Sequence, residues 1–364
     1  MINIAAPVID SEERRAVDEV IESGMLAQGP KVAELEESWA KYCGTKHALA
    51  VNSGTAAIHC ALYAAGVKEG DEVITTPYSF IATINPILML GARPVLVDID
   101  EETFNIDVSK IEAAITEKTK AIVPVDLYGQ PCDWAELQEI AKKHNLKIVE
   151  DACQAIGAEY KGIKTGSLGD FGCFSLYATK NIMCGEGGVV TTNSDEAAVA
   201  IRSFRQHGMV APYEYANLGY NYRMSDLHGA IAVEQLKKVE EFTKKRQENA
   251  RKLNDVLAGV AGIKIPTISE NRSHVYHQYT ILLDKDIQRD QFIASLRDKG
   301  VGAGIYYPKP LHAYPHIAKL GYKVGDFPVA EDLAARVVSL PVHPKVTDED
   351  IEIIAAAVKE SVNG

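Results

Sequence analysis

Residues 121–151 read AIVPVDLYGQPCDWAELQEIAKKHNLKIVED, and their pattern gives the clearest indication of the fold. Two short apolar runs, at residues 121–125 and 147–150, flank an amphipathic stretch at residues 133–144 with the spacing of a helix. A strand, a helix and a second strand in this order are typical of parallel strands joined by a crossover helix. We therefore expect a parallel sheet in this part of the chain.

The same alternation extends outward from this unit. Further strand candidates lie at residues 47–51, 72–75, 94–98 and 188–192, and a second amphipathic stretch lies at residues 108–115. Continuous apolar runs separated by helices are typical of a largely parallel sheet that helices cover on both faces. The expected fold class is therefore α/β. Because such sheets bind ligands beyond the carboxyl ends of their strands, the loops after these strand candidates are where a site is expected.

The pattern changes after about residue 225. A long helical pattern at residues 225–257 is followed by a strand candidate, a helix, another strand candidate and a final helix, at residues 276–283, 289–299, 302–307 and 348–362. Two or three strands with helices on one side make a small α+β domain. We expect a large domain over residues 1–240 and a small C-terminal domain over residues 241–364.

Charge and cysteine usage exclude several classes of protein. The chain of 364 residues has a net charge of −12, which argues against a nucleic-acid binder or a protein that docks on anionic lipid. Its six cysteines lack metal-ligand spacing and are expected to be free thiols in a reducing cytosol. No signal peptide is recognisable, and polar residues interrupt the uncharged stretch at residues 48–67. We expect a cytoplasmic protein without a membrane span.

Two residues at strand ends have charges that need partners. Asp151 follows the strand candidate at residues 147–150, where a buried carboxylate is costly unless it meets a cation or a strong donor. It can cap a following helix, or it can pair with a pyridinium nitrogen as in pyridoxal phosphate sites. Lys180 follows an apolar run and precedes the glycines at residues 185–188. It can be a surface charge, or a buried lysine with the depressed pKa that Schiff-base chemistry requires.

A third segment has the features of a phosphate site. Residues 52–57, NSGTAA, follow a strand candidate and open a helix. Backbone N–H groups at a helix N-terminus, together with small hydroxyls, suit a phosphate, although an ordinary strand–helix turn has the same residues. A phosphate cradle, a carboxylate and a lysine in this order match one cofactor, pyridoxal 5'-phosphate.

Ordered motifs over essentially the whole chain carry a family resemblance. They lie at residues 29–32, 52–57, 77–83, 91–100, 127–131, 150–157, 169–180, 185–188 and 219–224. With these motifs the sequence resembles the DegT-type sugar aminotransferases, which are pyridoxal phosphate enzymes of fold type I, the aspartate aminotransferase fold. The resemblance implies a large domain with a mainly parallel sheet and a small α+β domain. The family also contains a dehydratase branch in which histidine replaces this lysine, and the presence of Lys180 argues against that branch.

The resemblance implies a role for each matching residue. Lys180 corresponds to the lysine that attaches the cofactor and moves the proton, and Asp151 to the partner of the ring nitrogen. Phe80 is similar to the aromatic residue that stacks on the ring, and Gln154 to the residue near the phenolic oxygen. The expected phosphate contacts are Ser53, Gly54, Thr55 and Ser175. Asn221 resembles a residue that reaches the phosphate from the neighbouring subunit, which implies a homodimer with composite sites.

The implied reaction transfers an amino group from L-glutamate to a keto sugar linked to a nucleoside diphosphate. Gln154 and residues 304–312 resemble family members that act at carbon 3 of the sugar more than those that act at carbon 4. In that segment, Lys309 and His312 are candidates for binding the diphosphate, or belong to an ordinary surface loop. A cyclitol aminotransferase of the same family and a non-enzymatic regulator are the alternatives.

Overall fold

The structure, a computed structural model, describes residues 1–362. A seven-stranded sheet with the order β1-β9-β8-β5-β4-β2-β3 forms its centre. Its strands are β1 (His47–Val51), β2 (Glu72–Thr75), β3 (Arg93–Leu96), β4 (Thr119–Val123), β5 (Lys147–Asp151), β8 (Phe171–Ser175) and β9 (Gly188–Thr192). β9 pairs antiparallel with both β1 and β8, whereas the pairs from β8 to β3 are parallel. The expected mainly parallel sheet is confirmed.

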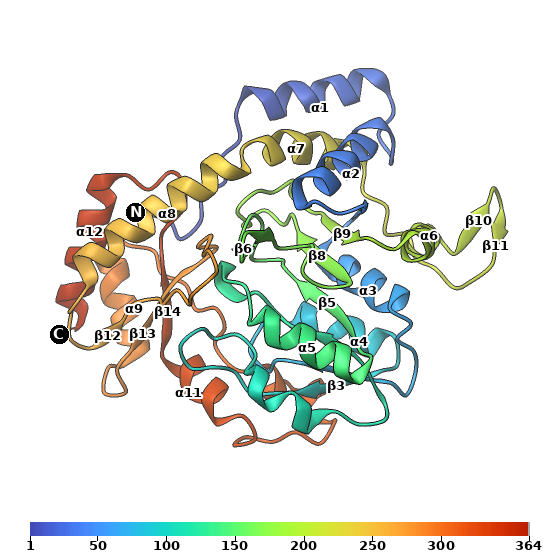
Figure 1. Ribbon diagram of the computed structural model, residues 1–364. Coiled ribbons are helices and arrows are strands. Elements are labelled where there is room, and N and C mark those ends of the chain that lie inside the picture. Colours follow the sequence, from blue (N-terminus) through green and yellow to red (C-terminus); the bar gives the residue numbers. More distant parts are fainter. Residues whose placement is uncertain (363–364) are drawn as a thin grey trace.

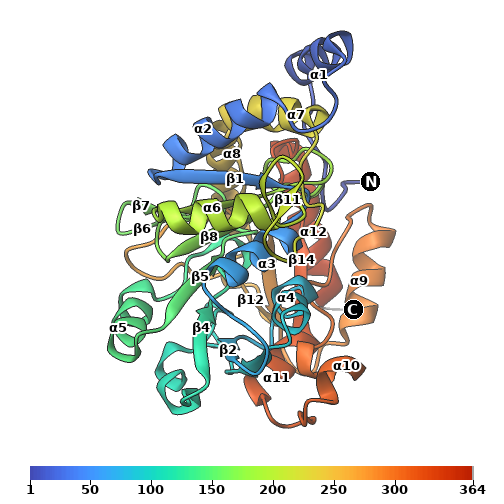
Figure 2. The same cartoon turned by 90° about the vertical axis from the view of Figure 1, so that its right-hand side faces the viewer.

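Helices cover both faces of this sheet (Figures 1 and 2). The core on one face contains side chains of α3 and α6, and the core on the other face contains side chains of α2, α5 and α7. The helices of this part are α1 (Ser11–Ser23), α2 (Pro30–Cys43), α3 (Gly54–Ala64), α4 (Asn85–Met89), α5 (Trp134–His144), α6 (Asp195–Phe204) and α7 (Asp226–Lys237). Because helices cover both faces of the sheet, a ligand site is expected at the ends of its strands.

Short elements connect the layers. They are the 3₁₀ turns η1 (Ile81–Thr83), η2 (Val108–Lys110), η3 (Glu112–Ala114) and η4 (Leu127–Gly129), and the hairpins β6 (Glu159–Tyr160) with β7 (Ile163–Lys164) and β10 (Met209–Ala211) with β11 (Glu214–Tyr215). The amphipathic stretch at residues 108–115 is therefore not one helix but two 3₁₀ turns. The side chain of Asp107 caps the first turn by accepting the Ser109 N–H.

The uncharged stretch at residues 48–67 is the buried strand β1, a turn and the buried helix α3. Ser53 caps α3 by accepting the N–H of Ala56 at 3.1 Å. Within residues 1–362 we find no helix that combines the length and the apolar character needed to cross a bilayer.

A second, smaller sheet lies in the C-terminal part. β13 (Tyr279–Leu283) pairs antiparallel with β12 (Ile263–Lys264) and β14 (Val337–Leu340). The accompanying helices are α8 (Val239–Leu257), α9 (Arg289–Asp298), α10 (Pro315–Ala318), α11 (Pro328–Arg336) and α12 (Asp348–Val362), with the 3₁₀ turn η5 (Leu311–Ala313). The predicted strand at residues 302–307 is wrong. Only Gly304 forms a bridge, to Ser339, and the chain then turns toward the large sheet, where the Tyr78 hydroxyl donates to the Tyr306 carbonyl.

The long helical pattern at residues 225–257 is two consecutive helices, α7 and α8, which meet at Lys238. The chain passes from the large sheet to the small one through α8 (Figure 1). The first residues are an exception to this division, because Ile2 exchanges backbone hydrogen bonds with Gly300 and Gly302, each 2.8 Å long. We propose a domain boundary near residue 240, with the N-terminal segment returning to the small domain.

Candidate active site

A cavity of about 470 Å³ lies at the carboxyl ends of β1, β2, β5 and β8. Its wall is completed by side chains from the C-terminal part of the chain. The lining residues are Ser53, Gly54, Thr55, Ile58, Ser79, Phe80, Ala82, Thr83, Asp151, Cys153, Gln154, Ser175, Tyr177, Thr179, Lys180, Glu186, His277, Gln278, Tyr306 and Tyr307. The cavity therefore brings together the lysine, the carboxylate and the cradle segment that the sequence placed far apart.

The cradle is the turn between β1 and α3. Gly54 is the first residue of α3, and a Cβ atom placed on it would lie 2.8 Å from the Cβ of Ser175. No side chain fits there without displacing the end of β8, so only glycine leaves the backbone open to the cavity. The N-terminus of α3 points its free N–H groups and its dipole at this space, which favours an anion.

Asp151 ends β5 inside the cavity and is 4% exposed. Its Oδ2 accepts a hydrogen bond from the Thr83 hydroxyl at 2.8 Å, and its Oδ1 accepts one from the N–H of Cys153 at 3.3 Å. No helix begins at residues 152–158, which form turns. The interpretation of Asp151 as a helix cap is therefore wrong, and its carboxylate faces the cavity.

Lys180 lies in the turn after β8, where its N–H donates to the Tyr177 carbonyl at 2.9 Å. The side chain is half-buried and lines the same cavity as Asp151. Burial lowers the pKa of the Lys180 ammonium below its ordinary value, although the nearby Cys153 and Asp151 oppose this shift. A lysine with a lowered pKa supplies more of the neutral amine that attacks a carbonyl group.

Gln154 and Phe80 frame the opening of the cavity. The Gln154 amide is fixed at both ends: its oxygen accepts the N–H of Tyr128 at 3.0 Å, and its nitrogen donates to the Tyr307 hydroxyl at 3.2 Å. The Phe80 ring is 55% exposed and lies 6.1 Å from the ring of Tyr307. An exposed aromatic face beside a cavity offers a flat partner a stacking surface.

His277 also lines the cavity, and sequence reasoning missed it. The Asn181 amide nitrogen donates to the Val275 carbonyl, so its oxygen faces Nδ1 of His277 at 3.2 Å. A carbonyl oxygen only accepts, so Nδ1 carries the hydrogen and Nε2 has a free lone pair. Burial and the nearby Lys180, Arg246 and His274 hold the pKa of His277 well below its ordinary value. The ring is therefore a neutral acceptor beside Lys180, and no sequence motif marks it.

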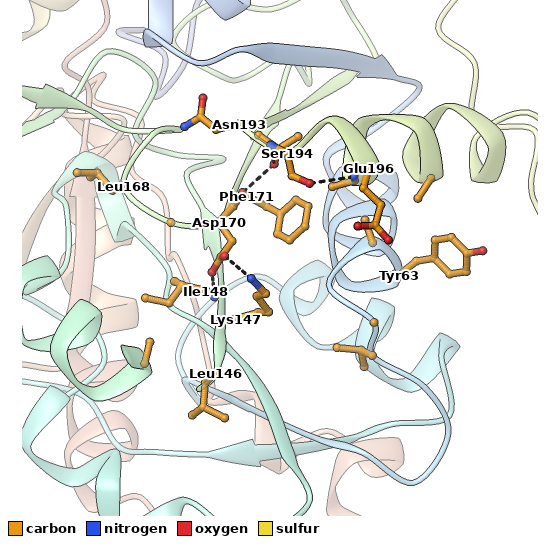
Figure 3. Close-up of a pocket in the computed structure, with 18 of the residues that line it drawn as sticks. Tyr63, Leu146, Lys147, Ile148, Leu168, Asp170, Phe171, Asn193, Ser194 and Glu196 are labelled. Carbon is orange, nitrogen blue, oxygen red and sulfur yellow. Dashed lines mark hydrogen bonds and ion pairs between the residues drawn. The ribbon is translucent and has the colours of Figure 1, made fainter. Parts of the chain in front are cut away.

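A larger depression, of about 1020 Å³, lies at the opposite edge of the sheet (Figure 3). It is near the amino ends of β5 and β8, where Lys147 pairs with Asp170 at 2.8 Å and Ser194 caps α6. In this view Asp170 accepts hydrogen bonds from Lys147 and from the N–H of Ile148, and Ser194 accepts one from the N–H of Ala197. The smaller cavity at the carboxyl ends of the strands has the chemistry of an active site.

Comparison with known proteins identifies the family. Residues 7–359 match the model of the DegT/DnrJ/EryC1/StrS aminotransferase family. This chain belongs to that family. A pleiotropic regulatory protein of Geobacillus stearothermophilus is 43% identical over 96% of this chain and 94% of its own, and GDP-perosamine synthase of Caulobacter vibrioides is 40% identical over 99% and 98%. The crystal structure of S. venezuelae DesV in complex with a ketimine intermediate has a TM-score of 0.94 at 35% identity, covering 97% of this chain and 95% of DesV.

The protein is thus an aminotransferase of fold type I that depends on pyridoxal 5'-phosphate. The cavity fits this cofactor on three observations of the structure. Gly54 leaves space at a helix N-terminus for a phosphate, Asp151 offers an oriented carboxylate, and Lys180 has a lowered pKa. The regulator alternative is disfavoured, because a non-enzymatic protein has no need of this combination.

Three predicted site residues of the aminotransferase lie outside the cavity lining. Asn221 is exposed, and its carbonyl accepts a hydrogen bond from the Asn52 amide at 3.3 Å. Lys309 is exposed, with its ammonium 4.3 Å from the ring centre of Tyr314. His312 is 1% exposed, and its Nε2 lies 2.9 Å from a carboxylate oxygen of Glu331. This burial and pairing do not support the predicted contact of His312 with a diphosphate.

Proposed function

We propose that this sugar aminotransferase moves an amino group from L-glutamate to a keto group, carbon 3 in preference to carbon 4, of a sugar linked to a nucleoside diphosphate. The observation that carries the proposal is the joint placement of Lys180, Asp151 and the Gly54 cradle in one cavity. The preference for carbon 3 rests on Gln154 and on the loop at residues 304–312, from which Tyr306 and Tyr307 line the cavity.

The residues divide the work between holding the cofactor and moving a proton. Lys180 supplies the amine that attaches the cofactor and later carries the proton between the two carbon atoms that exchange it. When bound, the cofactor supplies an electron sink for the electron pair that proton removal leaves behind. Asp151 would hold the ring nitrogen protonated, Phe80 would stack on the ring, and Gln154 would contact the phenolic oxygen.

The phosphate contacts in this proposal are Ser53, Gly54, Thr55 and Ser175 of the same chain and Asn221 of a second copy. Exposed apolar side chains on the segment around the hairpin of β10 and β11 support a homodimer, since Tyr213 is 87% and Leu218 is 77% exposed. That hairpin projects from the body of the molecule (Figure 1). The six free thiols support a reducing compartment, the cytoplasm.

The test is a transfer assay with the amino group of L-glutamate labelled with ¹⁵N. The purified holoenzyme is given 3-keto and 4-keto nucleotide sugars and, separately, a keto cyclitol, and NMR identifies the carbon that receives the label. We expect label on carbon 3 of a nucleotide sugar. Transfer only to the cyclitol would favour the alternative substrate class, and transfer only to carbon 4 would overturn the preference for carbon 3.

Variants of two lysines complete this assay. Lys180→Ala should abolish transfer, whereas Lys319→Ala, at an exposed lysine outside the cavity, should retain it. Borohydride treatment of the wild type followed by peptide mapping should place the pyridoxyl group on Lys180. Labelling of a different lysine would contradict the assignment.

A further inference from the structure

Two hydroxyl groups form a chain that ends on Asp151. The Thr83 hydroxyl oxygen lies 2.8 Å from Oδ2 of Asp151, and the Ser79 hydroxyl oxygen lies 2.8 Å from that of Thr83. Thr83 is 1% and Ser79 is 2% exposed. An ionised carboxylate only accepts, so Thr83 donates its single hydrogen to Asp151 and Ser79 donates to Thr83. The direction of both hydrogen bonds is therefore fixed.

The chain comes from a different part of the fold than the carboxylate does. Thr83 ends the turn η1, which begins directly after Phe80 and whose last N–H donates to the Phe80 carbonyl at 3.1 Å. Asp151 ends β5, where the other contact of its carboxylate is the longer hydrogen bond from Cys153, at 3.3 Å. One short turn thus places the exposed ring of Phe80 and, on its buried side, the shortest hydrogen bond to Asp151.

We propose that Thr83, supported by Ser79, is a positioning residue that keeps Asp151 ionised and directed at the ring nitrogen of the cofactor. The proposal rests on the proposed role of Asp151. Hydrogen bonds to the charged form of a carboxyl group favour that form, and they are stronger in a buried site than in water. A carboxylate without this donor is a stronger base and takes a larger share of the proton that it shares with the ring nitrogen.

The test measures where that proton lies. Holoenzyme is prepared with cofactor labelled with ¹⁵N in the ring, and the ¹⁵N chemical shift distinguishes a protonated from an unprotonated nitrogen. Thr83→Val keeps the shape of the side chain and removes the hydroxyl. In this variant the ¹⁵N signal of the cofactor ring should move toward the unprotonated position. Thr83→Ser retains the hydroxyl and should keep the wild-type shift, and Ser79→Ala should move it less than Thr83→Val does.

Cofactor affinity is the second measurement. A hydrogen bond to a charged group that is lost in a buried site predicts a roughly tenfold higher dissociation constant for Thr83→Val and a value near the wild type for Thr83→Ser. If Thr83 only fills space, Thr83→Val should have a dissociation constant near that of the wild type, and Thr83→Ser should have the higher one. A wild-type shift and a wild-type affinity in Thr83→Val would overturn the proposal.

Asp151→Asn separates this inference from the proposed function beneath it. The asparagine cannot hold the ring proton, so the ¹⁵N signal of the ring nitrogen should lie at the unprotonated position. If Asp151→Asn leaves the shift unchanged, Asp151 is not the partner of the ring and the proposed role itself fails. If Asp151→Asn moves the shift and both Thr83→Val and Ser79→Ala do not, only the role of the hydroxyl chain is overturned.

Discussion

Gly54 is the residue at which one added carbon atom has the largest expected effect on the site. Gly54→Ala would bring a Cβ atom to 2.8 Å from the Cβ of Ser175, and neither atom can rotate away. Overpacking of this kind costs about 1–3 kcal/mol of unfolding free energy. We expect that loss in denaturant unfolding, together with weaker cofactor binding in a titration. If Gly54→Ala has the stability and the cofactor affinity of the wild type, the turn accommodates the added carbon atom and the prediction is wrong.

His277 gives a second prediction at this scale. His277→Phe removes the acceptor at Nε2, so kcat/KM should fall by roughly 10²-fold, the lower range for acid–base groups. His277→Gln retains an acceptor and should lose less. Burial and the nearby Lys180 hold the pKa of His277 well below its ordinary value, so the ring does not titrate in its ordinary range. The wild-type rate should therefore show no loss near pH 6.5 from this residue, and an imidazole titration there would contradict its assignment.

The sequence pointed to some of the residues that line the cavity and missed others for a physical reason. Lys180, Asp151 and the Gly54 turn lie at strand ends with local signals, namely an apolar run, a charge and a glycine. His277 and Thr83 reach the cavity through tertiary packing, and nothing in their neighbouring residues marks that position. His312 was placed in the site by its neighbours in sequence, but the fold pairs it with Glu331 instead.

At the scale of elements, the end of β5 and the segment that follows β4 hold two buried carboxyl groups, those of Glu150 and Asp126. Glu150 accepts the N–H groups of Gly166 and Leu168, and Asp126 Oδ1 accepts that of Cys132. In the described chain, Asp126 Oδ2 is buried without a hydrogen-bond donor. Burial raises the pKa of both groups, that of Asp126 to about 7, so the pair holds a proton in the folded state.

The free energy of unfolding should therefore fall as the pH rises above mildly acidic values, because this pair then loses its proton. The folded state binds the proton more tightly than the unfolded chain, in which a carboxyl titrates near pH 4, so the contribution is present at low pH and is lost as the pH rises toward 7. Asp126→Asn donates to Glu150 without needing a proton. At pH 8 it should be more stable than the wild type by about 1–3 kcal/mol, and at pH 5 it should show little gain.

Denaturant unfolding at both pH values checks this prediction, and Asp107→Asn, at a half-buried carboxylate in another loop, is the control. Equal pH dependence in the wild type and in Asp126→Asn would show that the pair does not share a proton.

Elements with strong local patterns were predicted well from the sequence. The strands β1, β2 and β9 occupy the predicted residues, and β4 ends before Pro124, which has no N–H to donate to a neighbouring strand. Elements with weak local patterns were predicted poorly. β14, which reads VVSL, was missed, and a strand was predicted at residues 302–307, which read GAGIYY, because both runs are short and largely apolar. Only pairing with β13, which comes from elsewhere in the chain, selects between them.

At the scale of the molecule, the proposed homodimer makes a prediction about subunits. Asn221 lies outside the cavity lining of its own chain, so its proposed phosphate contact requires a second copy. A chain with Asn221→Ala is co-expressed with a chain that carries Lys180→Ala, each with its own tag. Each heterodimer then has one intact site and one site with both defects, and its activity should be about half that of the wild type.

The matched control places both substitutions in the same chain, which is co-expressed with the wild type. Every site in that heterodimer then has one defect, so its activity should stay low. If Asn221 serves its own chain, the two results are reversed. An inactive, cofactor-loaded heterodimer of the single variants would therefore rule out the shared site.

The pairing of Ile2 with Gly300 and Gly302 has a consequence for synthesis on the ribosome. The strands of the large sheet are complete once Thr192 has emerged, and N-terminal domains generally fold first. Gly300 and Gly302 are translated roughly 15–60 s after Ile2 itself, at about 5–20 residues per second. His277 and Tyr307 of the cavity wall also belong to this late part. The segment around Ile2 therefore lacks its backbone partners until Gly300 and Gly302, and with them the C-terminal wall of the cavity, have been made.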